Sequence, residues 1–120
     1  MIADIVLADD DGELRKALSD WLRSRGHVVR EAADGAQAFA MAADERPHLV
    51  IMDVVMTGLY GPAAARKLED FPGTHGIPVI LMSGTTDQAA LKDILKLPHI
   101  RFLRKPVDLK ALEKTMRALL

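Results

Sequence analysis

The sequence contains no cysteine, few aromatic residues (4%) and almost no net charge. The absence of cysteine excludes disulfides, iron–sulfur clusters and zinc sites built on thiolates. A net charge of -1, from 16 basic and 17 acidic residues, argues against direct nucleic-acid binding through a strongly basic surface. The four histidines are far apart and have no paired metal-ligand spacing: His27, His48, His75 and His99.

Long apolar runs are also missing, so no segment is expected to cross a membrane. The N-terminus has an acid, Asp4, where a secretory signal would have lysines. The 120 residues are 49% hydrophobic and 28% charged, which suits a single domain with a packed core. We therefore expect residues 1–120 to form one soluble domain of a reducing compartment, the cytoplasm, with neither a membrane nor nucleic acid as partner.

Short apolar runs alternate with amphipathic stretches along the whole chain. The apolar runs predict five strands: Ile2–Ala8, His27–Glu31, His48–Asp53, Ile77–Ser83 and Ile100–Arg104. The stretches between and after them predict five helices: Glu13–Arg25, Ala36–Asp44, Pro62–Glu69, Asp87–Leu95 and Leu109–Leu119. Strict alternation of strand and helix indicates an α/β fold with a parallel sheet covered by helices on both faces.

The composition of the strands predicts their order in this sheet. The first, third and fourth strands are almost continuously apolar, as strands buried on both faces should be. The second and fifth contain charged residues, which is typical of edge strands. With right-handed crossovers, the expected fold is a doubly wound five-stranded sheet in the order 2-1-3-4-5, flavodoxin-like.

Acidic residues end two strands that this order makes neighbours. Asp9, Asp10 and Asp11 follow the first strand, and Asp53 ends the third. Ligands of open α/β sheets bind at the carboxyl ends of the strands where the order reverses, which is between these two strands. Crowded carboxylates with no Cys or His beside them suit a hard cation such as Mg²⁺. A simpler interpretation for Asp11 is that it caps the first helix.

Two further polar residues end the neighbouring strands. Ser83 ends the fourth strand, and Lys105 follows the fifth. The lysine supplies a flexible point charge suited to a phosphate or a carboxylate. Taken singly, both residues have ordinary structural explanations. Together with Asp10 and Asp53 they place two acids, a hydroxyl and an ammonium at the ends of four parallel strands.

These residues resemble those of the CheY-like receiver domain of two-component response regulators. The resemblance covers essentially the whole chain, and it depends on the paired acids, on Asp53 within LVIMDVVM, on LMSGT at Ser83 and on FLRKP at Lys105. The spacing of these motifs also fits the family. The sequence departs from the family after Asp53, where Thr57 replaces a proline and Tyr60 an acid, and in the fifth strand, where Phe102 replaces the tyrosine of many members.

The resemblance implies a phosphoacceptor in which Asp53 takes a phosphoryl group from the phosphohistidine of a sensor histidine kinase or phosphotransfer protein. Asp10 would bind Mg²⁺ directly, Asp9 through water, and Val55 through its main-chain carbonyl. Such a domain signals rather than acting as an enzyme, apart from self-phosphorylation and slow self-dephosphorylation, and it would act on an effector domain or a downstream protein.

The resemblance also implies how the signal is transmitted. Lys105 would pair with Asp53 and neutralise phosphoryl oxygens, and the Lys105–Pro106 peptide would be cis. Ser83 would move to hydrogen-bond the phosphorylated aspartate, and Phe102 would move with it. This switch would remodel the surface formed by the fourth helix, the fifth strand and the fifth helix.

Two other functions remain open from the sequence. Asp9-x-Asp11-Gly12 and LMSGT also resemble motifs of haloacid-dehalogenase-type phosphatases, although Glu13 and the lack of an acid pair after Lys105 oppose this interpretation. The second alternative is a receiver-like module that acts only by protein contact and is not phosphorylated. The presence of Asp10, Asp53, Ser83 and Lys105 together argues against it.

Overall fold

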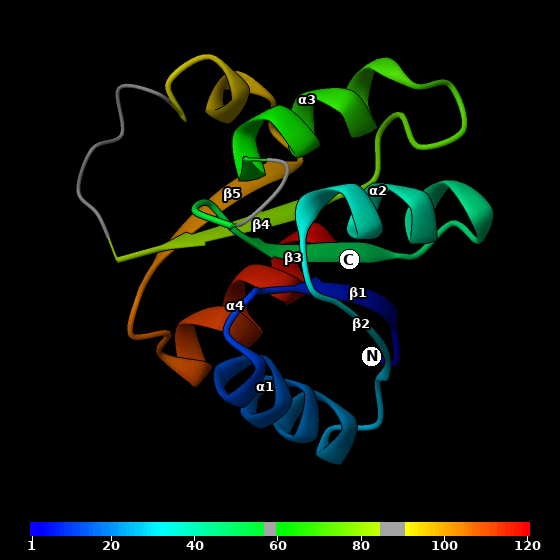
Figure 1. Ribbon diagram of the computed structural model, residues 1–120. Helices are drawn as coiled ribbons and strands as arrows, with labels where there is room; N and C mark the ends of the chain where they lie inside the picture. The colour runs from blue at the N-terminus through cyan, green and yellow to red at the C-terminus, as the bar shows by residue number, and fades with distance from the viewer. Residues whose placement is uncertain (57–59, 85–90) are drawn as a thin grey trace.

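The computed structural model describes residues 1–56, 60–84 and 91–120. Its five strands are all parallel and pair in the order β2-β1-β3-β4-β5 (Figure 1). The strands are β1 (Asp4–Ala8), β2 (Val28–Ala32), β3 (Leu49–Asp53), β4 (Val79–Ser83) and β5 (Ile100–Arg104). The predicted strand order is therefore confirmed, and each predicted strand overlaps an observed one.

Burial explains why these strands take these places. β3 and β4 are buried at every position, and β1 at all but Asp4, because each has a neighbour on both sides and helices on both faces. The edge strands β2 and β5 expose part of their length, including Val28 and Arg101. The exposed charges of β5 discourage edge-to-edge pairing with another sheet.

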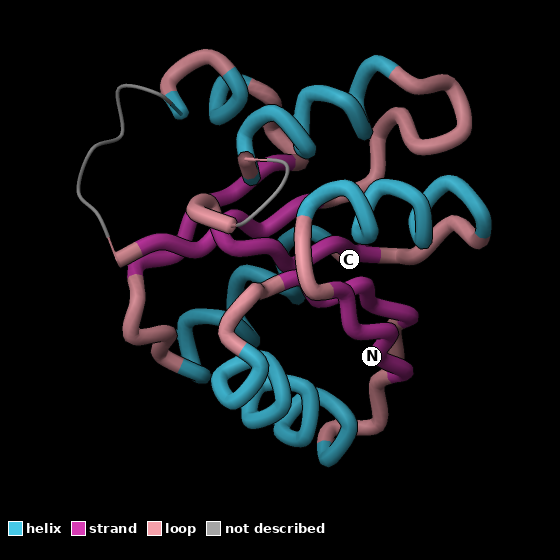
Figure 2. The backbone as a smooth tube through the Cα atoms, viewed as in Figure 1, coloured by secondary structure: helices cyan, strands magenta, loops and turns pink. Residues whose placement is uncertain are grey.

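The helices form one layer on each side of the sheet (Figures 1 and 2). They are α1 (Gly12–Ser24), α2 (Gly35–Asp44), α3 (Gly61–Asp70) and α4 (Leu109–Leu119). Side chains of α2 and α3 share one buried cluster with one face of the sheet. Side chains of α1 and α4 share a second cluster with the opposite face. This is the doubly wound α/β arrangement that the alternation of strands and helices predicts.

Aspartates begin three of the helices. The carboxylates of Asp11, Asp34 and Asp108 each accept a hydrogen bond from a backbone N–H in the first turn of α1, α2 or α4. These bonds satisfy amide groups that have no partner within the helix. Pro62 lies in the first turn of α3, where its missing N–H costs nothing.

The predicted helix Asp87–Leu95 differs from the structure in type, whereas the other predicted elements differ from the observed ones by at most about two residues at an end. Residues 85–90 lie outside the described residues. The described remainder contains η2 (Ile94–Lys96), a short 3₁₀ helix closed by hydrogen bonds between residues three apart. Leu91 and Ile94, also three apart, are both buried, and this spacing aligns side chains in a 3₁₀ helix. The prediction of an α-helix up to Leu95 is therefore wrong over the described part.

In this topology β1 and β3 are neighbours at the centre of the sheet, where the strand order reverses, and their carboxyl ends lie side by side. Among the residues that the structure describes, none of the helices combines the length and the apolar character that crossing a bilayer would require.

Candidate functional site

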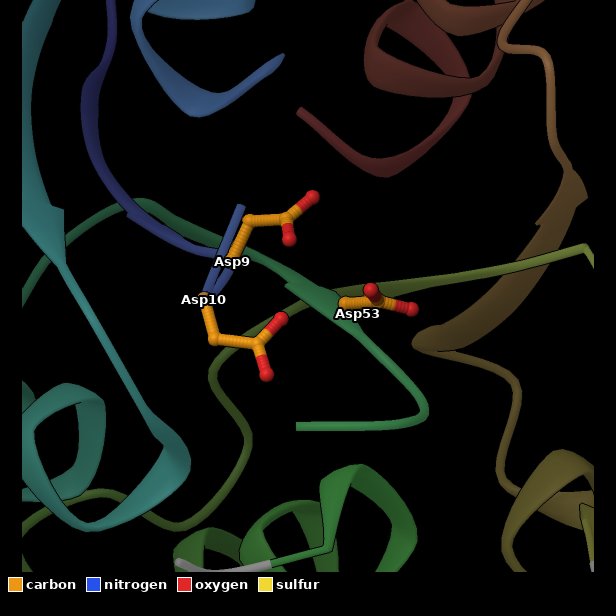
Figure 3. Close-up of side chains that lie close together, drawn as sticks. All are labelled: Asp9, Asp10 and Asp53. Carbon is orange, nitrogen blue, oxygen red and sulfur yellow. The ribbon is translucent and has the colours of Figure 1, made fainter. Parts of the chain in front are cut away.

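Three carboxylates meet at the carboxyl ends of β1 and β3 (Figure 3). Asp9 and Asp10 directly follow β1, Asp53 is the last residue of β3, and one oxygen from each lies within 4.8 Å of the others. Side chains alternate along extended backbone, so the adjacent Asp9 and Asp10 point in different directions beside Asp53 (Figure 3). Asp9 and Asp53 are buried, whereas Asp10 is exposed.

Lys105 bridges two of these acids from the carboxyl end of the edge strand β5. It follows β5, and its Nζ lies 2.8 Å from Oδ2 of Asp53 and 3.1 Å from Oδ2 of Asp9. The peptide between Lys105 and Pro106 is cis. The lysine thus offers one positive charge to two buried carboxylates, which would otherwise repel each other.

Burial and the charged partner act in opposite directions on each group of this pair, and the pKa of both groups is raised. Burial raises the pKa of the Asp53 carboxyl, and the hydrogen bond and charge of Lys105 offset that shift only in part. Burial alone would lower the pKa of Lys105, but its hydrogen bonds to Asp53 and Asp9 outweigh that effect, and the pKa of the ammonium is raised. Lys105 therefore remains charged at neutral pH.

Backbone amides hold the remaining oxygens of the two buried acids. Oδ1 of Asp9 accepts a hydrogen bond from the N–H of Asp11 at 3.0 Å, and Oδ1 of Asp53 accepts one from the N–H of Val55 at 3.4 Å. Both carboxylates are thus held in place by their own loops as well as by Lys105. Asp11 also caps α1, as the simpler interpretation of that residue predicted.

The structure places the other predicted site residues around this cluster. Ser83 is buried at the end of β4, and its carbonyl accepts a hydrogen bond from the N–H of Lys105 at 2.9 Å. Phe102 is half-buried in β5 against the cluster on the α2–α3 face. Val55 is exposed just after β3. Of the two departures from the family pattern that follow Asp53, Thr57 lies outside the described residues and Tyr60 precedes α3.

A family model for the response regulator receiver domain matches residues 5–117. The chain belongs to this family. Its relatives include the protein PilH of Pseudomonas aeruginosa, which is 39% identical over 120 residues, 99% of this chain and 98% of PilH. The response regulator PleD of Caulobacter vibrioides is 35% identical over 90% of this chain, which spans 24% of PleD.

Solved receiver structures have the same architecture. The chemotaxis protein CheY4 of Vibrio cholerae superimposes with a TM-score of 0.89 at 25% identity, covering 100% of both chains. As a receiver domain, this chain is a phosphoacceptor module of two-component signalling rather than an enzyme in the usual sense. The family match favours this function over both alternatives that the sequence left open.

Receiver domains generally bind Mg²⁺ at an acidic pocket, and the residues here fit that ion. The donors are carboxylate oxygens only, from Asp9, Asp10 and Asp53, and hard divalent cations prefer oxygen ligands. Three carboxylates beside the single charge of Lys105 leave an excess of negative charge that a cation would balance.

Sequence reasoning missed two features beside the acids. The first is a groove of about 620 Å³ between α1 and the segment entering α4. Its walls are apolar, with Trp21 and Val107 among them, and Asp9 and Lys105 line it as well. The second is Arg15 of α1, whose Nη1 donates a hydrogen bond to the carbonyl of Asp9 at 2.7 Å. Arg15, Trp21 and Val107 belong to none of the motifs, so only the fold reveals these contacts.

Proposed function

We propose that Asp53 is the phosphoacceptor of this receiver domain and that Mg²⁺ assists the transfer. The observation that carries this proposal is the position of the Asp53 carboxylate, buried, 2.8 Å from the ammonium of Lys105 and within 4.8 Å of two more acids. Phosphoryl transfer depends mainly on positioning and charge neutralisation, and this arrangement offers both.

Asp53 acts as a nucleophile. One of its carboxylate oxygens bonds to phosphorus while the phosphorus–nitrogen bond of the donor phosphohistidine breaks, and the electron pair of that bond stays on the imidazole. The Lys105 ammonium neutralises charge on the phosphoryl oxygens. The Ser83 hydroxyl then donates a hydrogen bond to one of those oxygens. A carboxylate nucleophile divides one difficult transfer into two easier ones, phosphorylation and later hydrolysis.

The acids have separate tasks toward the cation. Asp10 and Asp53 would bind Mg²⁺ directly, together with the main-chain carbonyl of Val55, and Asp9 would support it through water. Bound there, Mg²⁺ supplies positive charge to the phosphoryl oxygens. Asp9 also orients Lys105, because the same Nζ contacts both Asp9 and Asp53.

The partner is a histidine kinase or a phosphotransfer protein, and the output passes to an effector domain or a downstream protein. The apolar groove beside Lys105 and Asp9 supports this proposal, since it offers the donor a contact surface next to the acceptor. We also propose that residues 1–120 act as one receiver domain in the cytoplasm, where its donors would be found.

Mass spectrometry tests the acceptor. Incubation with acetyl phosphate and Mg²⁺ should add one phosphoryl group to the wild-type chain and none to Asp53→Asn. The matched control is Asp34→Asn, which removes a carboxylate from the start of α2 and should leave labelling intact. A full adduct in Asp53→Asn, mapped to Asp9 or Asp11, would instead favour the dehalogenase-type reaction.

Thermal unfolding tests the cation. A ligand that binds only the folded state stabilises it by about 2.7 kcal/mol at 100 times its Kd. Mg²⁺ should therefore raise the Tm of the wild-type protein, and Asp10→Asn should remove most of that gain. The assignment of Asp10 fails if the mutant keeps the wild-type response.

A further inference from the structure

Arg15 contacts the backbone of the segment that presents the paired acids. Its Nη1 donates a hydrogen bond to the carbonyl of Asp9 at 2.7 Å. Asp9 lies beyond the last residue of β1 that pairs with β3, so the sheet does not continue past it on that side. The guanidinium of Arg15 therefore holds the chain at the point where it leaves the sheet and turns into α1.

The same side chain is fixed at a second point. Its Nε donates a hydrogen bond to Oε1 of Glu31 at 3.1 Å, and Oε2 of Glu31 lies 3.6 Å from Nη1 of Arg23. Glu31 lies on β2, opposite Leu7 of β1. Arg15 thus ties the Asp9 backbone to the neighbouring strand. It uses two donors of one planar group, a geometry that a lysine cannot reproduce.

The contacts of the turn depend on one another. The N–H of Asp9 donates to the carbonyl of Ala32 on β2, and the N–H of Asp11 donates to the side chain of Asp9. Asp11 in turn caps α1, and its carbonyl accepts the backbone N–H of Arg15. A shift of the Asp9 carbonyl would therefore change the directions in which the carboxylates of Asp9 and Asp10 point.

The contact between Arg15 and Glu31 also controls where the positive charge of Arg15 lies. A guanidinium released from Glu31 would be attracted to the acidic cluster and would compete there with a divalent cation. Glu31 pairs with Arg15 at a partly buried position, where the two side chains are 28% and 22% exposed. The pairing keeps the positive charge of Arg15 on the β2 side of the turn.

From these contacts we propose that Arg15 is a positioning residue of the acidic site. It fixes the turn that carries Asp9 and Asp10, and Glu31 holds it away from their carboxylates. This inference rests on the proposed function of that site as a Mg²⁺-assisted phosphoacceptor.

The test compares Arg15→Lys, which keeps the charge and loses the planar fork, with Lys16→Gln. Lys16 is the next residue of α1, pairs with Asp20 and has a side chain 73% exposed, so its removal changes charge without touching the turn. Removing a residue that orients metal ligands typically weakens metal binding about 10–100-fold. We expect the Kd for Mg²⁺, measured by titration calorimetry, to rise about tenfold in Arg15→Lys and to stay within about twofold in Lys16→Gln.

Two further measurements separate positioning from charge and from the proposed function. In the metal-free protein, the Asp11 amide should exchange its hydrogen faster in Arg15→Lys than in Lys16→Gln, because its acceptor on Asp9 is no longer held. Glu31→Gln should also weaken Mg²⁺ binding, because it releases Arg15 toward the acids. Far-UV circular dichroism verifies that each variant is folded.

Each outcome has one meaning. Wild-type Mg²⁺ affinity in Arg15→Lys, or equal weakening in Lys16→Gln, overturns the positioning role. Unchanged affinity in Glu31→Gln overturns the part assigned to Glu31. If the wild-type protein itself does not bind Mg²⁺, the proposed function fails, and amide exchange in the metal-free protein still decides whether Arg15 holds the turn.

Discussion

The backbone of Gly61 packs directly against the strand end that carries Asp53. A Cβ atom at this position would lie 2.5 Å from the carbonyl oxygen of Asp53 and 2.8 Å from Cα of Val54. Both are backbone atoms that cannot move without disturbing β3, and the N–H of Gly61 also donates to the carbonyl of Val54. The absence of a side chain at Gly61 therefore permits α3 to begin beside Asp53.

We expect Gly61→Ala to lower the free energy of unfolding by about 1–3 kcal/mol, the usual cost of overpacking. Gly12→Ala is the matched control, because Gly12 also begins a helix and its added Cβ would meet nothing closer than Arg15 at 3.7 Å. Urea unfolding followed by circular dichroism measures both. Equal stability of the two variants would contradict the packing argument.

His27 makes the stability of the fold depend on pH. Its Nδ1 accepts a hydrogen bond from the N–H of Ala3 at 3.0 Å, which requires that nitrogen to be unprotonated. Burial, followed by the positive charge of the N-terminus, lowers the pKa of His27, and Glu113 opposes this shift. The unfolded chain therefore takes up a proton at higher pH than the folded protein does.

Stability should consequently fall as the pH drops from about 6.5, the ordinary pKa of histidine. His27→Gln should lose less stability between pH 7.5 and pH 5.5, since glutamine can accept the same bond without titrating. His48 accepts an equivalent bond from Asp4 at an exposed position, so His48→Gln is the control. Urea midpoints at the two pH values measure the effect, and the same slope in wild type and His27→Gln would exclude this role.

At the scale of elements, α1 contains a polar atom without a partner. Over residues 1–56, 60–84 and 91–120, Oγ of Ser19 is the only buried side-chain N or O atom that lacks a hydrogen bond. Ser19 itself lies on α1 and is fully buried. Leaving such a group unsatisfied costs about 1–3 kcal/mol, and alanine also favours a helix more than serine does.

Ser19→Ala should therefore raise the free energy of unfolding by about 1 kcal/mol. Ser24→Ala, at the end of the same helix, removes a hydroxyl that donates to the carbonyl of Trp21, and it should be neutral or slightly destabilising. Thermal unfolding compares the two. A lower Tm in Ser19→Ala would mean that the hydroxyl does have a stabilising contact.

The elements also show what the sequence could predict. Continuous apolar runs predicted β1, β3 and β4 because strands covered on both faces have no polar side. The type of helix before β5 is harder to predict, because buried residues at the spacing of Leu91 and Ile94 are compatible with an α-helix or a 3₁₀ helix. In the described part, the backbone hydrogen bonds of η2 have 3₁₀ geometry. Periodicity alone does not distinguish the two over so short a segment.

The candidate site likewise has features that the sequence predicts and one that it does not. Acids that end neighbouring parallel strands must meet, so strand order alone predicts that Asp9, Asp10 and Asp53 lie together. The contact of Arg15 with the Asp9 carbonyl follows from no such rule. It depends on how α1 is rotated against β2, which the sequence pattern leaves undetermined.

At the scale of the whole molecule, β4 and β5 lie between the proposed acceptor, Asp53 of β3, and the edge of the sheet. Ser83 and Leu81 lie on the same face of β4 because side chains alternate along a strand. Leu81 is the register partner of Phe102 on β5, and both belong to the cluster on the α2–α3 face. A movement of the Ser83 hydroxyl toward a phosphoryl group on Asp53 would therefore free space on the face that Phe102 occupies.

We expect the Phe102 ring to change environment when beryllofluoride and Mg²⁺ occupy the acceptor site. The ring has no hydroxyl, so its inner and outer positions differ in packing alone, and both should be populated before activation. Activation should then shift the balance inward. NMR of the rings measures this directly, because the chain has three phenylalanines and the other two, Phe39 and Phe71, pack edge to face against each other as internal references.

Ser83→Ala decides whether the serine carries this signal. It removes the hydroxyl that would hydrogen-bond the phosphoryl group, so occupation of the site should no longer move the Phe102 ring, while Phe39 and Phe71 stay constant in both proteins. A ring that does not respond in the wild-type protein, or that responds equally in Ser83→Ala, would exclude the coupling. If the response is lost only in Ser83→Ala, the acceptor, the end of β4 and the edge strand β5 form one continuous path from Asp53 to the surface of the molecule.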